Sequence, residues 1–476
     1  WVFVPFYTRS MVYTMPEFLE RRYNPQSRTI LSVISLVSYV LTKVAVTVYA
    51  GGLVFQQVFG IKELWGIDFF WIAAIGLVVL TALYTIFGGM KSVLYTSVLQ
   101  TPILLLGSLI ILVLGFKELG GWDEMMRVCG AVTVNDYGDT MTNLIRSNDD
   151  ANFPWLGALI GSAIIGFWYW CTDQFIVQRV LSGKNEMEAR RGTIFGAYLK
   201  LLPVFLFLIP GMIAFALHQK YIGAGGEGFL PMLANGTANA DAAFPTLVAK
   251  LLPAGVKGLV VCGILAALMS SLASLFNSSA MLFTIDFYKR FRPETPEKKL
   301  VGIGQIATVV IVILGILWIP IMRSVGDVLY TYLQDVQSVL APGIAAAFLL
   351  GICWKRTSAQ GGMWGLIAGM IIGLTRLGAK VYYSNAGEVA DSTFKYLFYD
   401  MNWLFFCGWM FLFCIIVVIV VSLATEAPTA EKIQGLVFGT ATKEQKAATR
   451  ASWDHWDIIH TVIILAITGA FYWYFW

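Results

Sequence analysis

Residues 255–288 read GVKGLVVCGILAALMSSLASLFNSSAMLFTIDFY, and this stretch carries only two charged side chains, Lys257 and Asp286. A helix rises 1.5 Å per residue, so about 20 mostly apolar residues cross the ~30 Å hydrocarbon core of a bilayer. The stretch is longer than that minimum. It therefore predicts a membrane-spanning helix with tilt, a kink or a polar interruption.

Ten further stretches meet the same criterion. They cover residues 28–60, 66–88, 92–116, 155–183, 190–218, 300–322, 325–353, 360–378, 398–424 and 456–476. The sequence therefore predicts an all-α membrane protein with about eleven complete transmembrane helices, which form one transmembrane domain over residues 1–476.

The composition agrees with a membrane protein and excludes several other classes. Of the 476 residues, 58% are hydrophobic and 13% are charged, whereas soluble domains carry about 25% charged residues. The net charge of +4 is too small and too scattered to indicate nucleic-acid binding. The six Cys have no metal-ligand spacing, and the three His form no catalytic cluster, so a soluble enzyme and a disulfide-stabilised module are both excluded.

The loops and the first residues indicate how the chain is placed in the membrane. Twenty of the 33 Lys and Arg fall in one alternate set of loops, at 9–28, 89–91, 179–191, 289–299, 355–356 and 425–455. This set is predicted to face the cytoplasm, so residues 117–154, 219–254 and 377–397 are predicted to face outward. The apolar segment Trp1–Phe6 has neither an initiator Met nor a charged region before it. We interpret it as the tail of a helix whose start is absent, not as a signal peptide.

Three polar side chains lie at membrane depth, where an ionisable group is costly and marks a site or a pathway. Lys200 lies about 10 residues into its span, or ~15 Å from the nearer end, too deep to reach water easily. It is either a buried Lys paired for packing or a donor into a polar cavity. For Lys43, a structural ion pair is an equally good interpretation. Gln334 offers a donor and an acceptor, which suits sugar hydroxyls but also suits a bond between two helices.

Two further segments have a composition that suits ligands. Residues 167–174 (FWYWCTDQ) combine four aromatic rings in a row with an acid near the middle of a span, which is typical of carbohydrate or amphipathic-ligand sites. Residues 267–274 (ALMSSLAS) are rich in small and hydroxyl side chains. These residues either serve close helix packing or supply oxygens to a hard cation such as Na⁺.

Several of these stretches resemble one family of proteins. They are Phe167–Arg179 (FWYWCTDQFIVQR), Gly196–Pro203 (GAYLKLLP), Met269–Lys289 (MSSLASLFNSSAMLFTIDFYK), Tyr332–Phe348 (YLQDVQSVLAPGIAAAF), Tyr13–Arg22 (YTMPEFLERR) and Gly88–Gln100 (GGMKSVLYTSVLQ). Together they resemble the sodium/solute symporter family, and within it the sodium/glucose and sodium/galactose branch. The resemblance implies an inverted five-plus-five helix repeat with peripheral helices, and a chain that lacks the first helices. Residues 1–116 would be the remainder of the first repeat, 155–353 the second repeat and 360–476 the peripheral helices of one transporter domain.

The resemblance also implies roles for single residues, each carried over by its match to a family motif. Ser270 and Ser271 match hydroxyl ligands of Na⁺, and Ala267 matches a carbonyl ligand of the same ion. Lys200 and Gln334 match contacts to sugar hydroxyls. The matching aromatic residues are Tyr169, which closes the sugar site on its cytoplasmic side, Trp170 at the sugar site and Tyr330 at the outer gate.

Three positions depart from the family pattern. Gly166 stands where a galactose-transporting member has an Asn that contacts sugar, so the identity of the sugar stays open. Ser97 stands where most of the branch has Asp, and Ala273 replaces a Thr found in members thought to couple two ions. The loss of a carboxylate and a hydroxyl removes what a second cation needs, so we predict one Na⁺ per sugar.

The expected function is therefore sodium-coupled import of a glucose- or galactose-type monosaccharide by alternating access, in the plasma or inner membrane. The expected partners are the sugar or a polyol, the co-transported Na⁺ and the lipid bilayer, with no organic cofactor and no nucleic acid. Two alternatives keep the fold, a myo-inositol or other polyol symporter and a sugar sensor that does not transport. A membrane-embedded enzyme is disfavoured because no His, Cys or acidic cluster lies at one membrane surface.

Overall fold

The computed structural model describes residues 1–233, 236–325, 328–386 and 390–475, except for the side chains at 84, 86–93, 96, 99 and 323–325. Almost all regular structure in this part is helical. Two short strands, β1 (Glu63–Leu64) and β2 (Ile67–Asp68), form an antiparallel hairpin. Its two turn residues, Trp65 and Gly66, both have positive φ (56° and 74°), the backbone that closes a two-residue hairpin.

The chain divides into two compact units, each built from segments far apart in sequence. Unit 1 comprises Trp1–Lys43, Asn148–Gly196 and Ser278–Ala466, and unit 2 comprises Val44–Ser147, Ala197–Asn277 and Ile467–Trp476. Each unit therefore draws residues from both predicted repeats, and the division into repeats stays a prediction.

Most of the helices of unit 1 are α-helices, with π-helical turns between some of them. They are α1 (Phe3–Ser10), α2 (Met15–Arg22), α3 (Pro25–Ser38), η1 (Tyr39–Val44), α7 (Trp155–Phe167), η2 (Trp168–Thr172), α8 (Gln174–Leu181), η5 (Leu282–Tyr288), α13 (Lys289–Phe291), α14 (Glu297–Val325), α15 (Leu329–Cys353), α16 (Ala359–Asn385), α17 (Thr393–Lys395), η6 (Tyr396–Asp400), α18 (Trp403–Ala424), α19 (Ala430–Ile433) and α20 (Lys443–Ala451).

Unit 2 holds fewer helices, and three more α-helices pass from one unit into the other. Those of unit 2 are α4 (Ala45–Phe59), α5 (Phe69–Leu119), α6 (Trp122–Gly130), η3 (Val204–Leu208), α10 (Ile209–Gly223), η4 (Ala240–Ala242) and α11 (Ala243–Leu251). The α-helices that contribute to both units are α9 (Glu186–Pro203), α12 (Ala254–Met281) and α21 (His455–Tyr474), and the π-helix η1 has its last residue, Val44, in unit 2.

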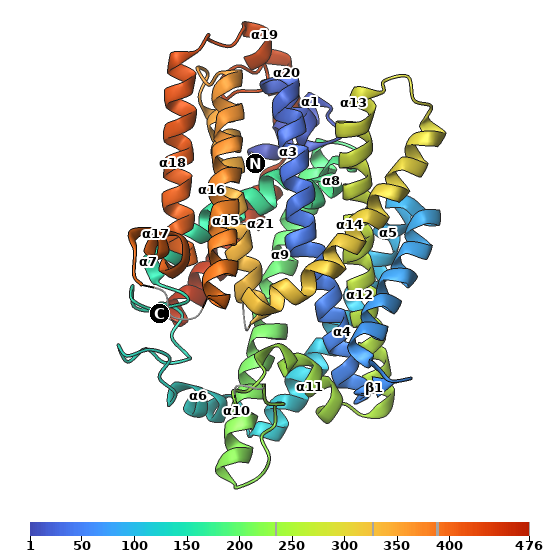
Figure 1. Ribbon diagram of the computed structural model, residues 1–476, viewed down its shortest axis with the longest axis vertical. Helices are drawn as coiled ribbons and strands as arrows, with labels where there is room; N and C mark the ends of the chain where they lie inside the picture. Colours follow the sequence, from blue (N-terminus) through green and yellow to red (C-terminus); the bar gives the residue numbers. More distant parts are fainter. Residues whose placement is uncertain (234–235, 326–327, 387–389, 476) are drawn as a thin grey trace. The chain divides into compact units, whose positions relative to one another are not determined.

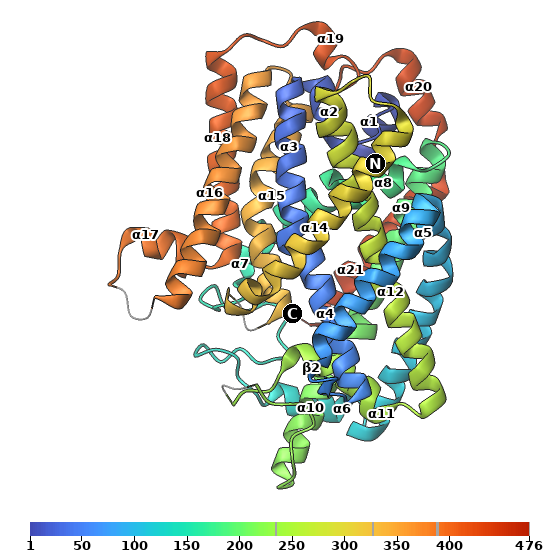
Figure 2. The same cartoon turned by 45° about the vertical axis from the view of Figure 1, so that its right-hand side comes forward.

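Among the described residues, ten helical segments are long and apolar enough to cross a membrane, and Phe69–Leu83 is a shorter apolar helix. The predicted span 92–116 lies in α5, and so does the predicted span 66–88 from Phe69 onward. Figures 1 and 2 show both ends of α5 at the end of unit 2 that carries the β1–β2 hairpin and α6, so this one element supplies both predicted spans.

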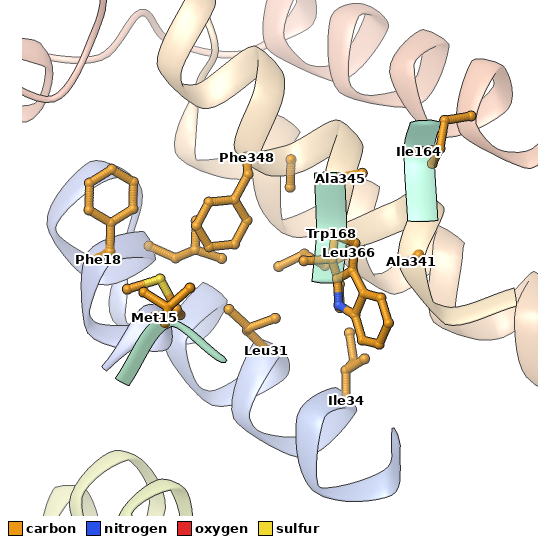
Figure 3. Close-up of a cluster of buried hydrophobic side chains, with 14 of the residues drawn as sticks. Met15, Phe18, Leu31, Ile34, Ile164, Trp168, Ala341, Ala345, Phe348 and Leu366 are labelled. Carbon is orange, nitrogen blue, oxygen red and sulfur yellow. The ribbon is translucent and has the colours of Figure 1, made fainter. Parts of the chain in front are cut away.

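The core of unit 1 forms where α2, α3, α7, η2 and α15 meet (Figure 3). Trp168 of η2 and Phe348 of α15 are 3% and 0% exposed, and they lie among the smaller side chains of the cluster. Phe18 stacks on Phe348 with ring centroids 5.9 Å apart and an interplanar angle of 9°. The core therefore places η2, with its aromatic run, in a fixed position against α15.

Helices α15, α16 and α18 run side by side in unit 1 (Figure 1). Glycines allow α15 and α16 to approach backbone to backbone, because a Cβ added at Gly369 would lie 2.6 Å from the Cα of Gly343. Small residues at helix contacts are the usual basis of association between membrane helices. This close packing gives α15, which carries Gln334, a rigid support.

Unit 2 has a separate apolar core. It is formed by side chains from α5, α6, α10, α11 and α12, among them Ile111, Met125, Ile213, Leu247 and Val260, all fully buried. The fully buried Cys129 of α6 belongs to this core, and burial raises the pKa of its thiol to about 11. All six cysteines are free thiols in this structure.

Candidate functional site

The predicted span 155–183 is a broken helix. It runs as α7, continues as the π-helix η2 and ends at Asp173, whose backbone is extended (φ −79°, ψ 121°), before α8 begins. The Asp173 carboxylate accepts a hydrogen bond from the Phe175 N–H at 3.2 Å and so caps α8. The break thus falls within the aromatic and acidic segment 167–174, and π-helical turns are common at functional sites.

A buried ion pair fixes this break to η1. Lys43 pairs with the Asp173 carboxylate, and the two side chains are 10% and 2% exposed. The Tyr39 hydroxyl donates a hydrogen bond to Asp173 Oδ1 at 3.1 Å and accepts one from the Phe175 N–H at 3.0 Å. The structure therefore favours the ion-pair interpretation of Lys43, and a carboxylate at this depth has both a cation and a hydroxyl donor.

Aromatic rings surround the Lys43 ammonium. Its Nζ lies 4.4 Å from the ring centre of Phe175, 4.6 Å from Tyr39, 5.6 Å from Tyr169 and 5.8 Å from Trp168. A cation within about 6 Å of a ring face is attracted by the ring quadrupole, more strongly when it is desolvated. The position of Tyr169 is therefore coupled to the ion pair at the helix break.

The two candidate aromatic residues of η2 differ in exposure. Tyr169 is partly buried, whereas Trp170 is 50% exposed, and their ring centroids lie 5.2 Å apart in an edge-to-face arrangement. Trp170 thus presents an accessible ring in the middle of a membrane-spanning segment.

Tyr330 and Gln334 lie one helical turn apart on α15 and form a side-chain hydrogen bond. The next residue, Asp335, pairs with Lys380 of α16, and its Oδ1 lies 3.7 Å from the Arg376 guanidinium. The structure therefore brings Tyr330 and Gln334 together and adds a charged cluster directly beside them.

Part of this cluster lies beyond the predicted end of its span. The sequence predicts that the span after residue 360 ends at 378 and that an outward loop follows, but α16 continues to Asn385. The helix can continue because Lys380 pairs with Asp335 and because the buried Arg376 donates to the Met401 carbonyl at 2.7 Å. The spacing of Arg376 and Lys380, one helical turn apart, was the available signal that the helix continues. Their partner Asp335 lies on another helix, α15, so the sequence alone does not reveal it.

In unit 2, Ala267, Ser270 and Ser271 share one face of α12, since they are spaced three and four residues apart. Ser270 is 7% exposed, and its hydroxyl lies 2.6 Å from that of Ser97 on α5. The Ser274 hydroxyl donates to the Ser270 carbonyl at 2.9 Å, while the adjacent Ala273 is fully buried. The position that departs from the acidic family pattern, Ser97, therefore contacts a predicted sodium ligand.

Lys200 lies near the middle of the helical segment Glu186–Gly223 and is exposed, not buried in packing. Pro203 ends the α-helix three residues later, and the π-helix η3 follows. An exposed cation at mid-span beside an irregular turn indicates access to water or to a polar ligand.

The eight candidate residues divide equally between the units. Tyr169, Trp170, Tyr330 and Gln334 belong to unit 1, and Lys200, Ala267, Ser270 and Ser271 belong to unit 2. Within the described ranges, no group of three His, Cys, Asp or Glu side chains could hold a metal ion. The oxygen donors at Ser270 and Ser271 are instead the hydroxyl and carbonyl type that hard cations prefer.

Comparisons with known proteins agree with this architecture. The sequence profile of the sodium:solute symporter family matches residues 1–369. A sodium/mannose cotransporter of Bos taurus is 36% identical over 100% of this chain and 82% of its own length. Sodium/myo-inositol cotransporter 2 of Homo sapiens is 35% identical over 92% of this chain and 66% of its own length, so the chain spans just under two thirds of that relative.

A solved structure shows the same fold. It is the substrate-bound, outward-open state of a Na⁺-coupled sialic acid symporter, with a TM-score of 0.65 and 21% identity over 90% of this chain and 81% of that one. This similarity and the family profile confirm the predicted fold class, an all-α membrane protein with an inverted five-plus-five helix repeat.

Proposed function

Because this chain belongs to the sodium:solute symporter family, we propose that it imports a glucose- or galactose-type monosaccharide together with Na⁺ by alternating access. The members of the family are multi-pass membrane transporters and not enzymes, and Na⁺ is the co-transported ion. These points confirm the predicted class, location and ion. The sugar, the stoichiometry and the site residues are part of the proposal.

The broken helix α7–η2–α8 is the observation that carries the proposal. It presents the ring of Trp170 at mid-span beside Tyr169. Flat ring faces with nearby hydrogen-bond donors and acceptors are what a sugar ring with its hydroxyl groups requires. In the proposal, Lys200 and Gln334 contact the sugar hydroxyls, Trp170 contacts the sugar and Tyr330 closes the outer gate.

Tyr169 is proposed to close the site on its cytoplasmic side. Its ring lies 5.6 Å from the Lys43 ammonium, which pairs with Asp173 at the helix break. Any movement of Tyr169 that releases sugar must therefore alter a buried cation–ring contact. The broken helix supplies a joint at which such a movement can occur.

The proposed sodium ligands are the Ala267 carbonyl and the hydroxyls of Ser270 and Ser271. The 2.6 Å contact between Ser97 and Ser270 supports one ion per sugar, because this neighbour brings a neutral hydroxyl where most of the branch has a carboxylate. The fully buried Ala273 adds no oxygen from its side chain. A second cation would lack both the charge and the ligand that it needs.

The proposed cycle begins when Na⁺ binds from outside and stabilises the outward-facing state, so that sugar binds more tightly. One charge that crosses 100 mV contributes about 2.3 kcal/mol to inward movement. A polyol is the second candidate cargo, and the myo-inositol cotransporter among the relatives favours it. Polyols and hexoses present similar hydroxyl groups to the same side chains.

The test is uptake of labelled glucose, galactose, mannose and myo-inositol into liposomes that contain the protein, with and without an inward Na⁺ gradient. We expect Na⁺-driven accumulation of a hexose. Lys200→Ala should abolish it, whereas Lys184→Ala, which removes an exposed Lys from the loop before α9, should not. Accumulation of myo-inositol alone would show that the cargo is a polyol and not a hexose. Tight sugar binding without any flux would show that the protein is a sensor and would refute the proposed transport.

A further inference from the structure

An apolar groove opens on unit 1, between α3 with η1 on one side and α14 with η5 on the other. These elements lie beside one another in Figure 2. The groove has a volume of about 570 Å³, within the range of about 300–1,000 Å³ that is typical of ligand sites. The lining residues are Leu36, Val37, Val40, Leu41, Phe283, Tyr288, Ile303, Ile306, Ala307, Val310, Ile311 and Leu314. Only the Tyr288 hydroxyl among these side chains is polar.

The length of the groove along α14 matches the thickness of one leaflet of a bilayer. Its lining on α14 runs from Ile303 to Leu314, which is about 16 Å at 1.5 Å per residue. Half of the ~30 Å hydrocarbon core is about 15 Å. Ile306 and Leu314 are 66% and 48% exposed on this membrane-spanning helix, so the groove lies on a surface that faces lipid.

One end of the groove is basic. Tyr288 and Ile303 mark that end, and the chain between them carries five cations against two acids, Glu294 and Glu297. The cations are Lys289, Arg290, Arg292, Lys298 and Lys299, and all five are exposed. None of them forms an ion pair within the part of the chain that the structure describes.

We propose that this groove binds an acyl chain of an anionic phospholipid from the predicted cytoplasmic leaflet, with the phosphate of its headgroup on the five cations. The chain-length match, the apolar lining and the basic end each correspond to one part of such a lipid. A neutral lipid or a sterol would leave the cluster of cations without a counter-charge. Clusters of four to eight Lys and Arg at a membrane surface are typical of anionic lipid recognition.

The bound acyl chain also packs against a functional element. Val40 and Leu41 of η1 line the groove, and Lys43 of the same π-helix pairs with Asp173 at the broken helix. The Leu41 carbonyl accepts a hydrogen bond from the Tyr332 hydroxyl at 2.9 Å. The proposed lipid therefore packs against η1, the π-helix that carries Lys43 of the ion pair.

Photocrosslinking tests the proposal on the full chain in phosphatidylcholine liposomes. Phosphatidylglycerol and phosphatidylcholine, each with a diazirine in one acyl chain, are compared as trace probes, and the labelled fragments are identified by mass spectrometry. We expect the phosphatidylglycerol probe to label residues 36–41 and 303–314 in preference to the rest of the chain. Lys298→Glu with Lys299→Glu should reduce the preference for phosphatidylglycerol by about fivefold for each cation removed.

Two variants on α14 separate the groove from the general lipid-facing surface. Ala307→Phe fills the groove and should abolish labelling of 303–314 by both probes, whereas Val309→Phe, at an exposed position outside the lining, should leave it unchanged. Size-exclusion profiles confirm that the variants are folded. Equal labelling by both probes in the original chain, unchanged labelling in Ala307→Phe, or displacement of the probe by cholesterol but not by unlabelled phosphatidylglycerol would each refute the proposal.

Discussion

Replacement of Lys43 by Met removes the cation from the buried Asp173 carboxylate at the helix break. The two side chains are only 10% and 2% exposed, so water cannot replace the lost partner. Removal of one partner of a buried ion pair typically destabilises a protein by about 3–5 kcal/mol, since the other charge stays buried and unpaired. The loss of the ammonium from the rings of Phe175 and Tyr39 adds to this effect.

Asp173→Asn should destabilise the protein by a similar amount, because it leaves the Lys43 ammonium without its carboxylate. The Asn side chain can still accept hydrogen bonds from the Tyr39 hydroxyl and the Phe175 N–H, which the carboxylate accepts at 3.1 and 3.2 Å. The double variant contains no buried charge at this position. Its loss of stability should therefore fall short of the sum of the single losses by about 2–3 kcal/mol.

The assay is equilibrium unfolding with SDS in mixed micelles, followed by tryptophan fluorescence, for the original chain, both single variants and the double variant. Arg127→Ala is the control, because it breaks an exposed pair with Glu124 on α6 and should leave the free energy of unfolding unchanged. A coupling energy for Lys43 and Asp173 below about 0.5 kcal/mol would equal that of a surface pair. Such a result would refute the inference that this pair holds the broken helix against η1.

Three other predictions rest on close contacts within the two units. Gly369→Ala should destabilise the protein by about 1–3 kcal/mol in the same assay, because its new Cβ meets the backbone of α15 at 2.6 Å. Gly378→Ala on the same helix has no atom within 4 Å of its Cβ and should be neutral or slightly stabilising, so equal losses would contradict the packing argument. Ser97→Ala should raise the Na⁺ concentration for half-maximal uptake about fivefold, since one hydrogen bond to Ser270 is worth about 1 kcal/mol. Ser97→Asp with Ala273→Thr should raise the Hill coefficient for Na⁺ from about 1 towards 2, and an original chain with a value near 2 would show that the one-ion proposal is wrong.

Much of the fold could be read from the sequence because membrane helices are determined locally. A run of about 20 apolar residues must satisfy its backbone hydrogen bonds within itself, whatever it later packs against. The ten spans found among the described residues, with the shorter helix Phe69–Leu83, therefore correspond to the eleven predicted stretches. The end of α16 could not be read in this way, because Lys380 remains in the helix through a partner on α15.

The candidate site shows the same division. Motif matches and spacing were enough to place Ala267, Ser270 and Ser271 on one face of α12, because residues three and four apart on a helix always share a face. They also singled out the aromatic segment 167–174, in which the helix breaks. These are properties of short segments, and the sequence contains them completely.

Only the tertiary structure decided which of these segments meet. It paired Lys43 with Asp173, 130 residues along the chain, and set Ser97 against Ser270, 173 residues away. It also formed the groove between α3 and α14 and placed its basic end at Tyr288. No local pattern determines such contacts, because they depend on how separate helices pack and because the stability of a buried charge depends on the partner that packing brings to it.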